Sequence, residues 1–284
     1  MKPLAEHRVV PGLPQPGRTL VVGVVNVTPD SFSDGGQWFD PEAAIAHGLE
    51  LIAEGADIVD VGGESTRPGA ERPPVEEELR RVLPVVRALS AATYISIDTM
   101  RAEVAAAGLE AGARLVNDVS GGQADPAMLG LVAEAEVPYV CMHWRGHSTD
   151  MQSRATYADV VREVVAELDE QAVRAERAGI DPERLILDPG FGFAKTGEHN
   201  WELLQRMDEL DRLGRPLLMG VSRKTFLGTL LADPTGRSRP ARERDDATTA
   251  LTFELARHRV WGVRVHAVRP SRDAIAVAER LRGR

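Results

Sequence analysis

The chain has 284 residues, of which 43% are hydrophobic, and its formal net charge is −9 at pH 7. This size and composition predict one large or two small globular domains with a full hydrophobic core, and the negative charge argues against general binding to nucleic acids or anionic membranes. No run approaches the roughly 18 apolar residues of a membrane span and no secretory signal opens the sequence, so we expect a cytoplasmic protein.

Strand-like runs and amphipathic segments alternate along most of the sequence. Residues 1–18 are rich in Pro and Gly and lack periodicity, so we expect an extended lead-in ahead of a domain that spans residues 19–284. The predicted strands of that domain are 19–28, 56–63, 94–99, 114–121, 138–144, 184–190, 216–224 and 261–266. The predicted helices are 41–54, 75–90, 101–111, 126–135, 157–178, 199–213, 245–258 and 271–282.

This alternation indicates the fold class. Near-continuous apolar strands joined by helices predict a parallel sheet that is covered on both faces. Eight strand–helix units fit a single-domain α/β fold, the (β/α)8 TIM barrel, whose usual size is about 250 residues. The competing fold is a doubly wound open sheet, but that fold normally carries a G-x-G-x-x-G turn after its first strand, and none is present there.

Polar residues end the predicted strands, where the active site of such a barrel lies. A strand commonly ends where it meets water, so any one of these residues alone could be a simple strand end. Together they predict a polar site on one face of the barrel. In chain order they are Asn26, Glu64, Asp98, Asn117, Asp118, His143, Asp188, Ser222, Arg223, Lys224, Arg264 and His266.

The fifth strand holds two residues with simpler interpretations. Cys141 is the single cysteine, which excludes an internal disulfide, and its apolar neighbours predict a buried side chain more than a reactive thiol. His143 and His147 are four residues apart, a spacing that serves zinc on a helix, but Gly146 between them favours a loop.

The last strand suggests an anion site. Arg264 and His266 are two residues apart, so their side chains point to the same side of the strand. If that side is the barrel mouth, they form a clamp of two bases for a phosphate-type ligand, and Asn26 adds a neutral metal ligand or a donor to the same anion. The alternative is a solvated arginine beside a core histidine.

Two aspartates suggest a heterocycle site. Asp98 and Asp188 each follow an apolar run, so we expect their carboxylates near apolar walls, where a charge is costly unless donors meet it. The 2-aminopyrimidinone edge of a heterocycle offers paired N–H donors to a carboxylate, and Asn117 suits the same edge. The alternative is a pair of salt bridges on the barrel floor.

These residues lie in motifs that resemble one family, the dihydropteroate synthases of folate synthesis, which sulfonamides inhibit. The matching motifs follow one another along nearly the whole chain. They are NVTPDSFSDGG, DVGGESTRPGA, SIDT, NDVSGG, MH, LDPGFGFAKTGEHN, GVSRKTFLG and RVH. One departure is Ala267, where the family often has an acidic residue after the histidine.

The resemblance implies a transferase that joins 6-hydroxymethyl-7,8-dihydropterin pyrophosphate to p-aminobenzoate and releases pyrophosphate with Mg²⁺. It also implies a homodimer. The residues implied to hold the pterin are Asp98, Asn117, Asp188 and Lys224. Those implied to hold the pyrophosphate and its metal are Asn26, Arg264 and His266, with Asn26 as the metal ligand.

The resemblance further implies two mobile loops over the reacting centre. The loop residues in the substrate-binding set are Phe32, Thr66, Arg67 and Pro68, and the first loop also holds Asp34. Other substrate-binding residues are Met142, Phe193, Gly220 and Ser222, the last near the aminobenzoate. The implied catalytic residues are Asp34, Lys224, Arg264 and His266.

Two other functions compete with a synthase. The pterin domain of methyltetrahydrofolate methyltransferases binds no pyrophosphate. The residues that would lack a shared purpose there are Arg67, Lys224, Arg264 and His266. A catalytically silent paralogue would bind a pterin or a partner protein, but the complete loop motifs and the two bases of the last strand argue against it.

Overall fold

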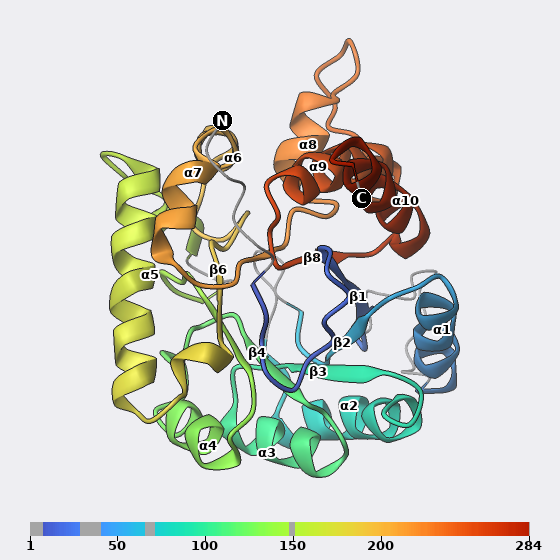
Figure 1. Ribbon diagram of the computed structural model, residues 1–284, viewed down its shortest axis with the longest axis vertical. Helices are drawn as coiled ribbons and strands as arrows, with labels where there is room; N and C mark the ends of the chain where they lie inside the picture. Colours follow the sequence, from blue (N-terminus) through green and yellow to red (C-terminus); the bar gives the residue numbers. More distant parts are fainter. Residues whose placement is uncertain (1–7, 29–40, 66–71, 148–150, 284) are drawn as a thin grey trace.

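The computed structural model describes residues 8–28, 41–65, 72–147 and 151–283. Within them, eight strands form one sheet in the order β6-β5-β4-β3-β2-β1-β8-β7, and every pairing is parallel. Leu187 pairs with Leu217, and its N–H donates to the carbonyl of Pro216 at 2.9 Å, which joins the two ends of the sheet. The predicted (β/α)8 TIM barrel is confirmed, and Figure 1 shows the helices arranged around the strands.

The bounds of the elements follow the predicted alternation. The strands are β1 (Leu20–Asn26), β2 (Ile58–Gly62), β3 (Tyr94–Asp98), β4 (Leu115–Asp118), β5 (Tyr139–Met142), β6 (Leu185–Asp188), β7 (Leu218–Met219) and β8 (Gly262–Val265). The helices are α1 (Pro41–Ala53), α2 (Val75–Leu89), α3 (Ala102–Glu110), α4 (Met128–Ala135), α5 (Val160–Arg177), α6 (Gly197–Gln205), α7 (Met207–Leu210), α8 (Thr225–Leu230), α9 (Asp245–Arg257) and α10 (Val268–Leu281).

Three helical regions differ from the prediction. The helix expected at 199–213 is split into α6 and α7, because Arg206 between them leaves helical geometry with φ −114° and ψ 38°. The short helix α8 was not predicted, since its sequence directly continues the polar end of the seventh strand motif. Helix α5 begins later than expected, at Val160, because the Asp159 carboxylate accepts the N–H of Arg162 and caps the helix.

Side chains alternate between the barrel interior and the helices. One buried cluster joins Leu20, Ile58, Leu115, Val140, Ile186 and Leu218 from the starts of the strands. A second cluster holds the residues between them, such as Val21, Val59 and Leu187, with apolar residues of the helices. Because strand side chains alternate, the residues two positions after the first cluster also face the interior. They include Asp60, Asn117, Met142, Asp188 and Gly220.

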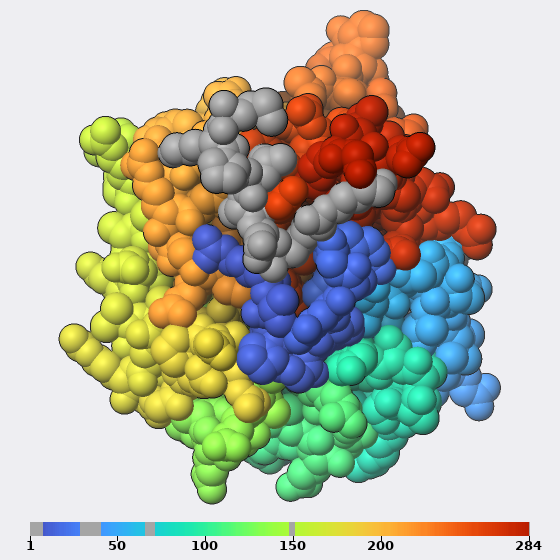
Figure 2. Space-filling view, in the orientation of Figure 1, coloured from blue at the N-terminus to red at the C-terminus, as the bar shows by residue number. Residues whose placement is uncertain are grey.

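The described part of the lead-in covers the floor of the barrel. Residues 8–18 form no helix or strand, and Val10 and Leu13 are buried in the interior cluster, beside Trp261 and the first residues of the strands. In Figure 2 the dark-blue residues of this segment lie at the middle of the face turned to the viewer. The interior is therefore closed by apolar packing at this end, so a ligand has to approach from the carboxyl ends of the strands.

Cys141 is fully buried, as predicted, and burial raises the pKa of its thiol. None of the helices in the described ranges has the length and apolar character needed to cross a bilayer.

Candidate functional site

A cluster of opposite charges lies inside the barrel at the carboxyl ends of its strands. The Arg264 guanidinium donates through Nε to Asp60 Oδ2 at 2.6 Å and through Nη2 to Asp98 Oδ2 at 2.7 Å. Asn117 Nδ2 donates to the same Asp60 oxygen at 3.1 Å. Asp60 is fully buried, and its other oxygen, Oδ1, has no hydrogen-bond partner within the described ranges. The cluster therefore has more carboxylate oxygen than donors to satisfy it.

The register of the sheet places several predicted residues in one row. Asn26 of β1 pairs with Gly62, Gly62 with Asp98, and Asp98 with Asn117. The Asp98 side chain is 12% exposed, and burial together with the neighbouring Asp60 raises the pKa of its carboxyl to about 8, although Arg264 acts in the opposite direction. Donors from a ligand would favour the charged form of Asp98.

Asp188 lies on the facing side of the barrel interior. Its Oδ1 accepts the N–H of Gly190 at 2.7 Å, which fixes the orientation of the carboxylate. The second oxygen, Oδ2, is next to Gly220, where a Cβ would lie 3.7 Å from it, so glycine leaves this oxygen uncovered. Burial raises the pKa of Asp188 to about 6, opposed by the Gly190 bond and by Lys224. The structure thus presents a second under-satisfied carboxylate to a ligand.

Lys224 and Phe193 border this carboxylate. The Lys224 ammonium lies 4.2 Å from the centroid of the Phe193 ring, a cation–π contact. Burial, with a contribution from Arg264, lowers the pKa of Lys224 to about 8. Phe193 also packs against an apolar cluster of Met100, Val119 and Met142. A flat ring bound beside Asp188 would therefore meet an apolar wall as well as polar groups.

Ser222 and His266 meet at the ends of β7 and β8. Ser222 Oγ accepts the backbone N–H of His266 at 3.2 Å and lies 3.0 Å from His266 Nδ1. The serine hydroxyl can donate to Nδ1 or accept from it, and when it donates, the imidazole proton is on Nε2. Burial, followed by the nearby Arg223 and Arg264, lowers the pKa of His266 to about 3.

The two bases of the last strand therefore differ from the predicted clamp. His266 is neutral in this arrangement, and the charge of Arg264 is already matched by two aspartates. Sequence spacing predicted their proximity but not these partners. Within the described ranges, Arg264 Nη1 makes no hydrogen bond, and in the tautomer with the proton on Nε2, His266 is a neutral donor. The pair can still donate two hydrogen bonds to an anion, with one net charge.

The barrel brings most of the predicted residues to one end. They are Asn26, Asp98, Asn117, Met142, Asp188, Phe193, Gly220, Ser222, Lys224, Arg264 and His266. The predicted loop residues Phe32, Asp34, Thr66, Arg67 and Pro68 lie outside the described residues. Asp60 was missed by the strand-end argument, because it lies two residues before the end of β2. An acidic residue within the apolar run IVDVG was the signal that could have identified it.

A metal ion could be held only in part by the described residues. No group of three or more His, Cys, Asp or Glu side chains in these ranges is arranged to hold one. Mg²⁺ commonly takes one or two protein oxygens and completes its shell with water and substrate phosphates. The amide oxygen of Asn26, at the end of β1 beside Gly62, fits that kind of site.

The chain is similar to proteins of known activity over nearly its full length. Residues 22–266 match the model of a family described as pterin binding enzyme. A dihydropteroate synthase of Mycobacterium leprae is 56% identical over 259 residues, which cover 90% of this chain and 91% of that protein.

Solved structures give the same result. A dihydropteroate synthase of Xanthomonas albilineans with 4-aminobenzoic acid matches with a TM-score of 0.86 at 46% identity, over 94% of each chain. Its complex with 7,8-dihydropteroate matches at 0.82 and 43%, over 94% of this chain and 95% of that one. A Yersinia pestis dihydropteroate synthase with a sulfonamide drug complex matches at 0.89 and 37%, over 98% of this chain and 100% of that one.

Proposed function

Because the chain belongs to the dihydropteroate synthases, a group of pterin-binding enzymes, we propose that it makes 7,8-dihydropteroate from 6-hydroxymethyl-7,8-dihydropterin pyrophosphate and p-aminobenzoate. The observation that carries this proposal is the pair of carboxylates, Asp98 and Asp188, in the barrel interior. Burial raises the pKa of both. A ligand with paired N–H donors satisfies such groups, and the amino-pyrimidinone edge of a pterin is one.

The described residues suggest how the pterin is held. Asp188 offers Oδ2 beside Gly220, and Asn117 offers an amide from β4, two strands away from Asp188 in the sheet. Phe193 with its apolar neighbours supplies a wall for the ring, and Lys224 lies over the Phe193 face. The ring is thus oriented by hydrogen bonds at one edge, which directs its substituted methylene toward the open end of the barrel.

The reaction is a substitution at that exocyclic methylene. The bond from the methylene carbon to the pyrophosphate oxygen breaks, and a bond to the amine nitrogen of p-aminobenzoate forms. The product ammonium then loses one proton. No side chain has to act as a nucleophile, so the contribution of the protein is orientation and stabilisation of charge.

The groups that meet the departing pyrophosphate lie at the end of β8. Arg264 supplies a fixed positive charge, and His266 supplies an Nε2–H donor when the Ser222 hydroxyl donates to Nδ1. Asn26 would supply an oxygen to Mg²⁺, which when bound would neutralise part of the charge that develops on pyrophosphate. The electrostatic effect of these groups increases as that charge grows, and this favours the transition state over the bound substrate.

A pyrophosphate-release assay tests the proposal. We expect release that requires the pterin pyrophosphate, p-aminobenzoate and Mg²⁺ together. Pyrophosphate release that does not depend on p-aminobenzoate would indicate a hydrolase, and pterin binding without any release would support a silent paralogue. The homodimer and the cytoplasmic location stay predictions, and sedimentation of the purified protein would test the first.

A further inference from the structure

The turn that follows β6 has an unusual backbone. Between Asp188 and Lys195, three residues have positive φ, namely Gly190 at 69°, Gly192 at 78° and Ala194 at 46°. Alanine rarely adopts this left-handed region, so the turn is held there by its surroundings. The Tyr157 hydroxyl donates to the carbonyl of Ala194 at 2.9 Å. A second part of the support comes from the side chain that ends the turn.

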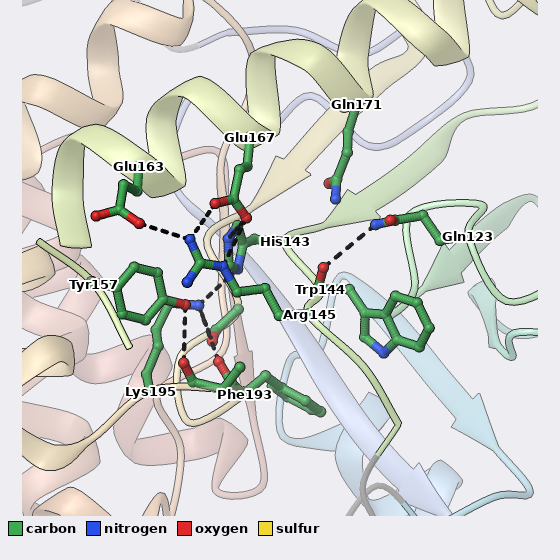
Figure 3. Close-up of polar contacts among 12 residues, drawn as sticks. Gln123, His143, Trp144, Arg145, Tyr157, Glu163, Glu167, Gln171, Phe193 and Lys195 are labelled. Carbon is green, nitrogen blue, oxygen red and sulfur yellow. Dashed lines mark hydrogen bonds and ion pairs between the residues drawn. The ribbon is translucent and has the colours of Figure 1, made fainter. Parts of the chain in front are cut away.

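Lys195 is buried beneath this turn. The side chain is 3% exposed, and its ammonium lies 3.1 Å from the carbonyl of Gly190, 3.1 Å from that of Phe193 and 3.0 Å from His143 Nδ1. An ammonium has three hydrogens, and each of them here has an acceptor. Figure 3 shows Lys195 between the Phe193 carbonyl and the His143 ring. One side chain thus fastens the turn at two carbonyls and connects it to β5.

Burial lowers the pKa of Lys195 to about 7, and a relay of hydrogen bonds connects its ammonium form to a carboxylate. Since His143 Nδ1 accepts from Lys195, its proton is on Nε2, which donates to Glu167 Oε2 at 2.9 Å. Burial and the neighbouring Lys195 lower the pKa of His143 to about 4, so the ring is neutral. Although burial acts in the other direction, hydrogen bonds from His143 and Arg145 lower the pKa of Glu167. A buried cation is therefore connected to a carboxylate of α5 through a neutral imidazole (Figure 3).

A buried lysine with three hydrogen-bond partners needs an explanation other than packing. Taking an ammonium out of water is costly, and an apolar side chain of similar volume would fill the space without that cost. What only an ammonium provides is simultaneous donation to the Gly190 carbonyl, the Phe193 carbonyl and an imidazole. The residues on this turn supply two parts of the pterin site, because the Gly190 N–H fixes the Asp188 carboxylate and the Phe193 ring forms a wall under Lys224.

We propose that Lys195 is a positioning residue for the pterin substrate, which acts by holding the turn that presents Asp188 and Phe193 in the geometry that binds the ring. The inference rests on the proposed function, since it assigns the pterin to that turn. Lys195 does not touch the substrate in this account. Its removal affects the pterin half of the reaction and leaves the p-aminobenzoate half unchanged.

Kinetics of a Lys195→Met variant separate this role from general destabilisation. We expect its affinity for 6-hydroxymethyl-7,8-dihydropterin, measured by calorimetry, to fall about tenfold to a hundredfold, because a misplaced turn weakens the charge-assisted contacts of Asp188. The Michaelis constant for the pterin pyrophosphate should rise in parallel. That for p-aminobenzoate should stay within about twofold, since the proposal assigns the turn held by Lys195 to the pterin.

The matched control is Tyr139→Phe. It removes another buried hydrogen bond of β5, from the Tyr139 hydroxyl to Asp118 Oδ2 at 2.8 Å, on the face of the strand that packs against the helices. We expect a lower unfolding temperature for this variant but an unchanged Michaelis constant for the pterin. The control thus shows what the loss of a buried hydrogen bond on the helix-facing side does to the kinetics.

A folded Lys195→Met variant with unchanged pterin affinity, or with equal losses for both substrates, would overturn the inference. If Lys195→Met does not fold, Glu167→Gln tests the inference from the far end of the relay. We expect this variant to lose pterin affinity by about threefold to tenfold. Unchanged pterin affinity in Glu167→Gln would overturn the inference equally. Failure of the proposed function is recognised separately, because it would show as absent pterin binding or absent pyrophosphate release in the unaltered protein.

Discussion

Asp188→Asn is the sharpest perturbation of the pterin site. The amide oxygen of asparagine can still accept the Gly190 N–H that Asp188 Oδ1 now accepts at 2.7 Å, so the side chain keeps its orientation. The amide nitrogen then takes the place of Oδ2 beside Gly220. It presents donors to the donors of the ligand, and a charge-assisted pair is lost. We expect pterin affinity to fall by about 1.5–3 kcal/mol, or roughly tenfold to 150-fold in Kd.

The stability of the same variant distinguishes binding from a structural role. Burial raises the pKa of Asp188 to about 6, above its usual value of 3.8, so the fold disfavours the charged form and stability from this group decreases as the pH rises through that interval. Removing the charge should therefore not lower the free energy of unfolding at pH 7. Calorimetry with 6-hydroxymethyl-7,8-dihydropterin and denaturant titration give the two quantities.

Asp118→Asn is the comparison variant for this experiment. Asp118 is also a buried aspartate at a strand end, but it accepts from Ser120, Gly122 and Tyr139 and not from a ligand. Its variant should lose stability and keep pterin affinity. An Asp188→Asn variant that behaved in this way, with lower stability and unchanged affinity, would refute the reasoning and assign Asp188 to the structure of the barrel.

Three further outcomes are expected. Pterin binding between about pH 6 and pH 8 should release protons, because ligand donors lower the raised pKa of Asp98 and Asp188. Calorimetry in buffers of different ionisation enthalpy measures the number of protons released. A binding enthalpy that does not depend on the buffer would contradict this expectation. His266→Ala should reduce kcat with little change in affinity for the unphosphorylated pterin. Arg264→Ala should also destabilise the fold by about 3–5 kcal/mol, since Asp60 and Asp98 lose their cation. Unfolding and binding measurements on each variant test the difference. From the sequence alone, we expect p-aminobenzoate to bind measurably only when Mg²⁺ and pyrophosphate are present. Phe32→Ala should raise the Michaelis constant for p-aminobenzoate more than that for the pterin substrate. Equilibrium dialysis that shows tight binding of p-aminobenzoate to the free protein would contradict the first expectation.

The sequence was most informative where periodicity and strand ends coincide. Apolar runs that alternate with amphipathic segments predicted the barrel, because a parallel sheet buried on both faces requires them. The residues at the ends of those runs, such as Asp98, Asp188 and Arg264, converge because parallel strands end on the same side. Which residues are neighbours along one strand, and which residue ends that strand, can be read directly from the sequence.

Contacts between distant strands were not predictable in this way. Asp60 joins Arg264, which is 204 residues away, and only the closure of the barrel sets that distance. The charge state of His266 depends on burial and on Arg223 and Arg264 around it, so spacing alone predicted two cations where the structure has one. The relay from Lys195 to Glu167 crosses three elements, and its sequence signal was limited to a lysine in an arginine-rich chain.

The central claim is that the site at the carboxyl ends of the strands joins a pterin to an arylamine. Mass spectrometry of a reaction with both substrates and Mg²⁺ tests it most directly, with pyrophosphate quantified in the same sample. The account predicts 7,8-dihydropteroate and pyrophosphate in equal amounts, and loss of both in Asp188→Asn at a pterin concentration below its Michaelis constant. Pterin binding by a folded protein that forms no dihydropteroate, or pyrophosphate release in excess of product, would contradict it.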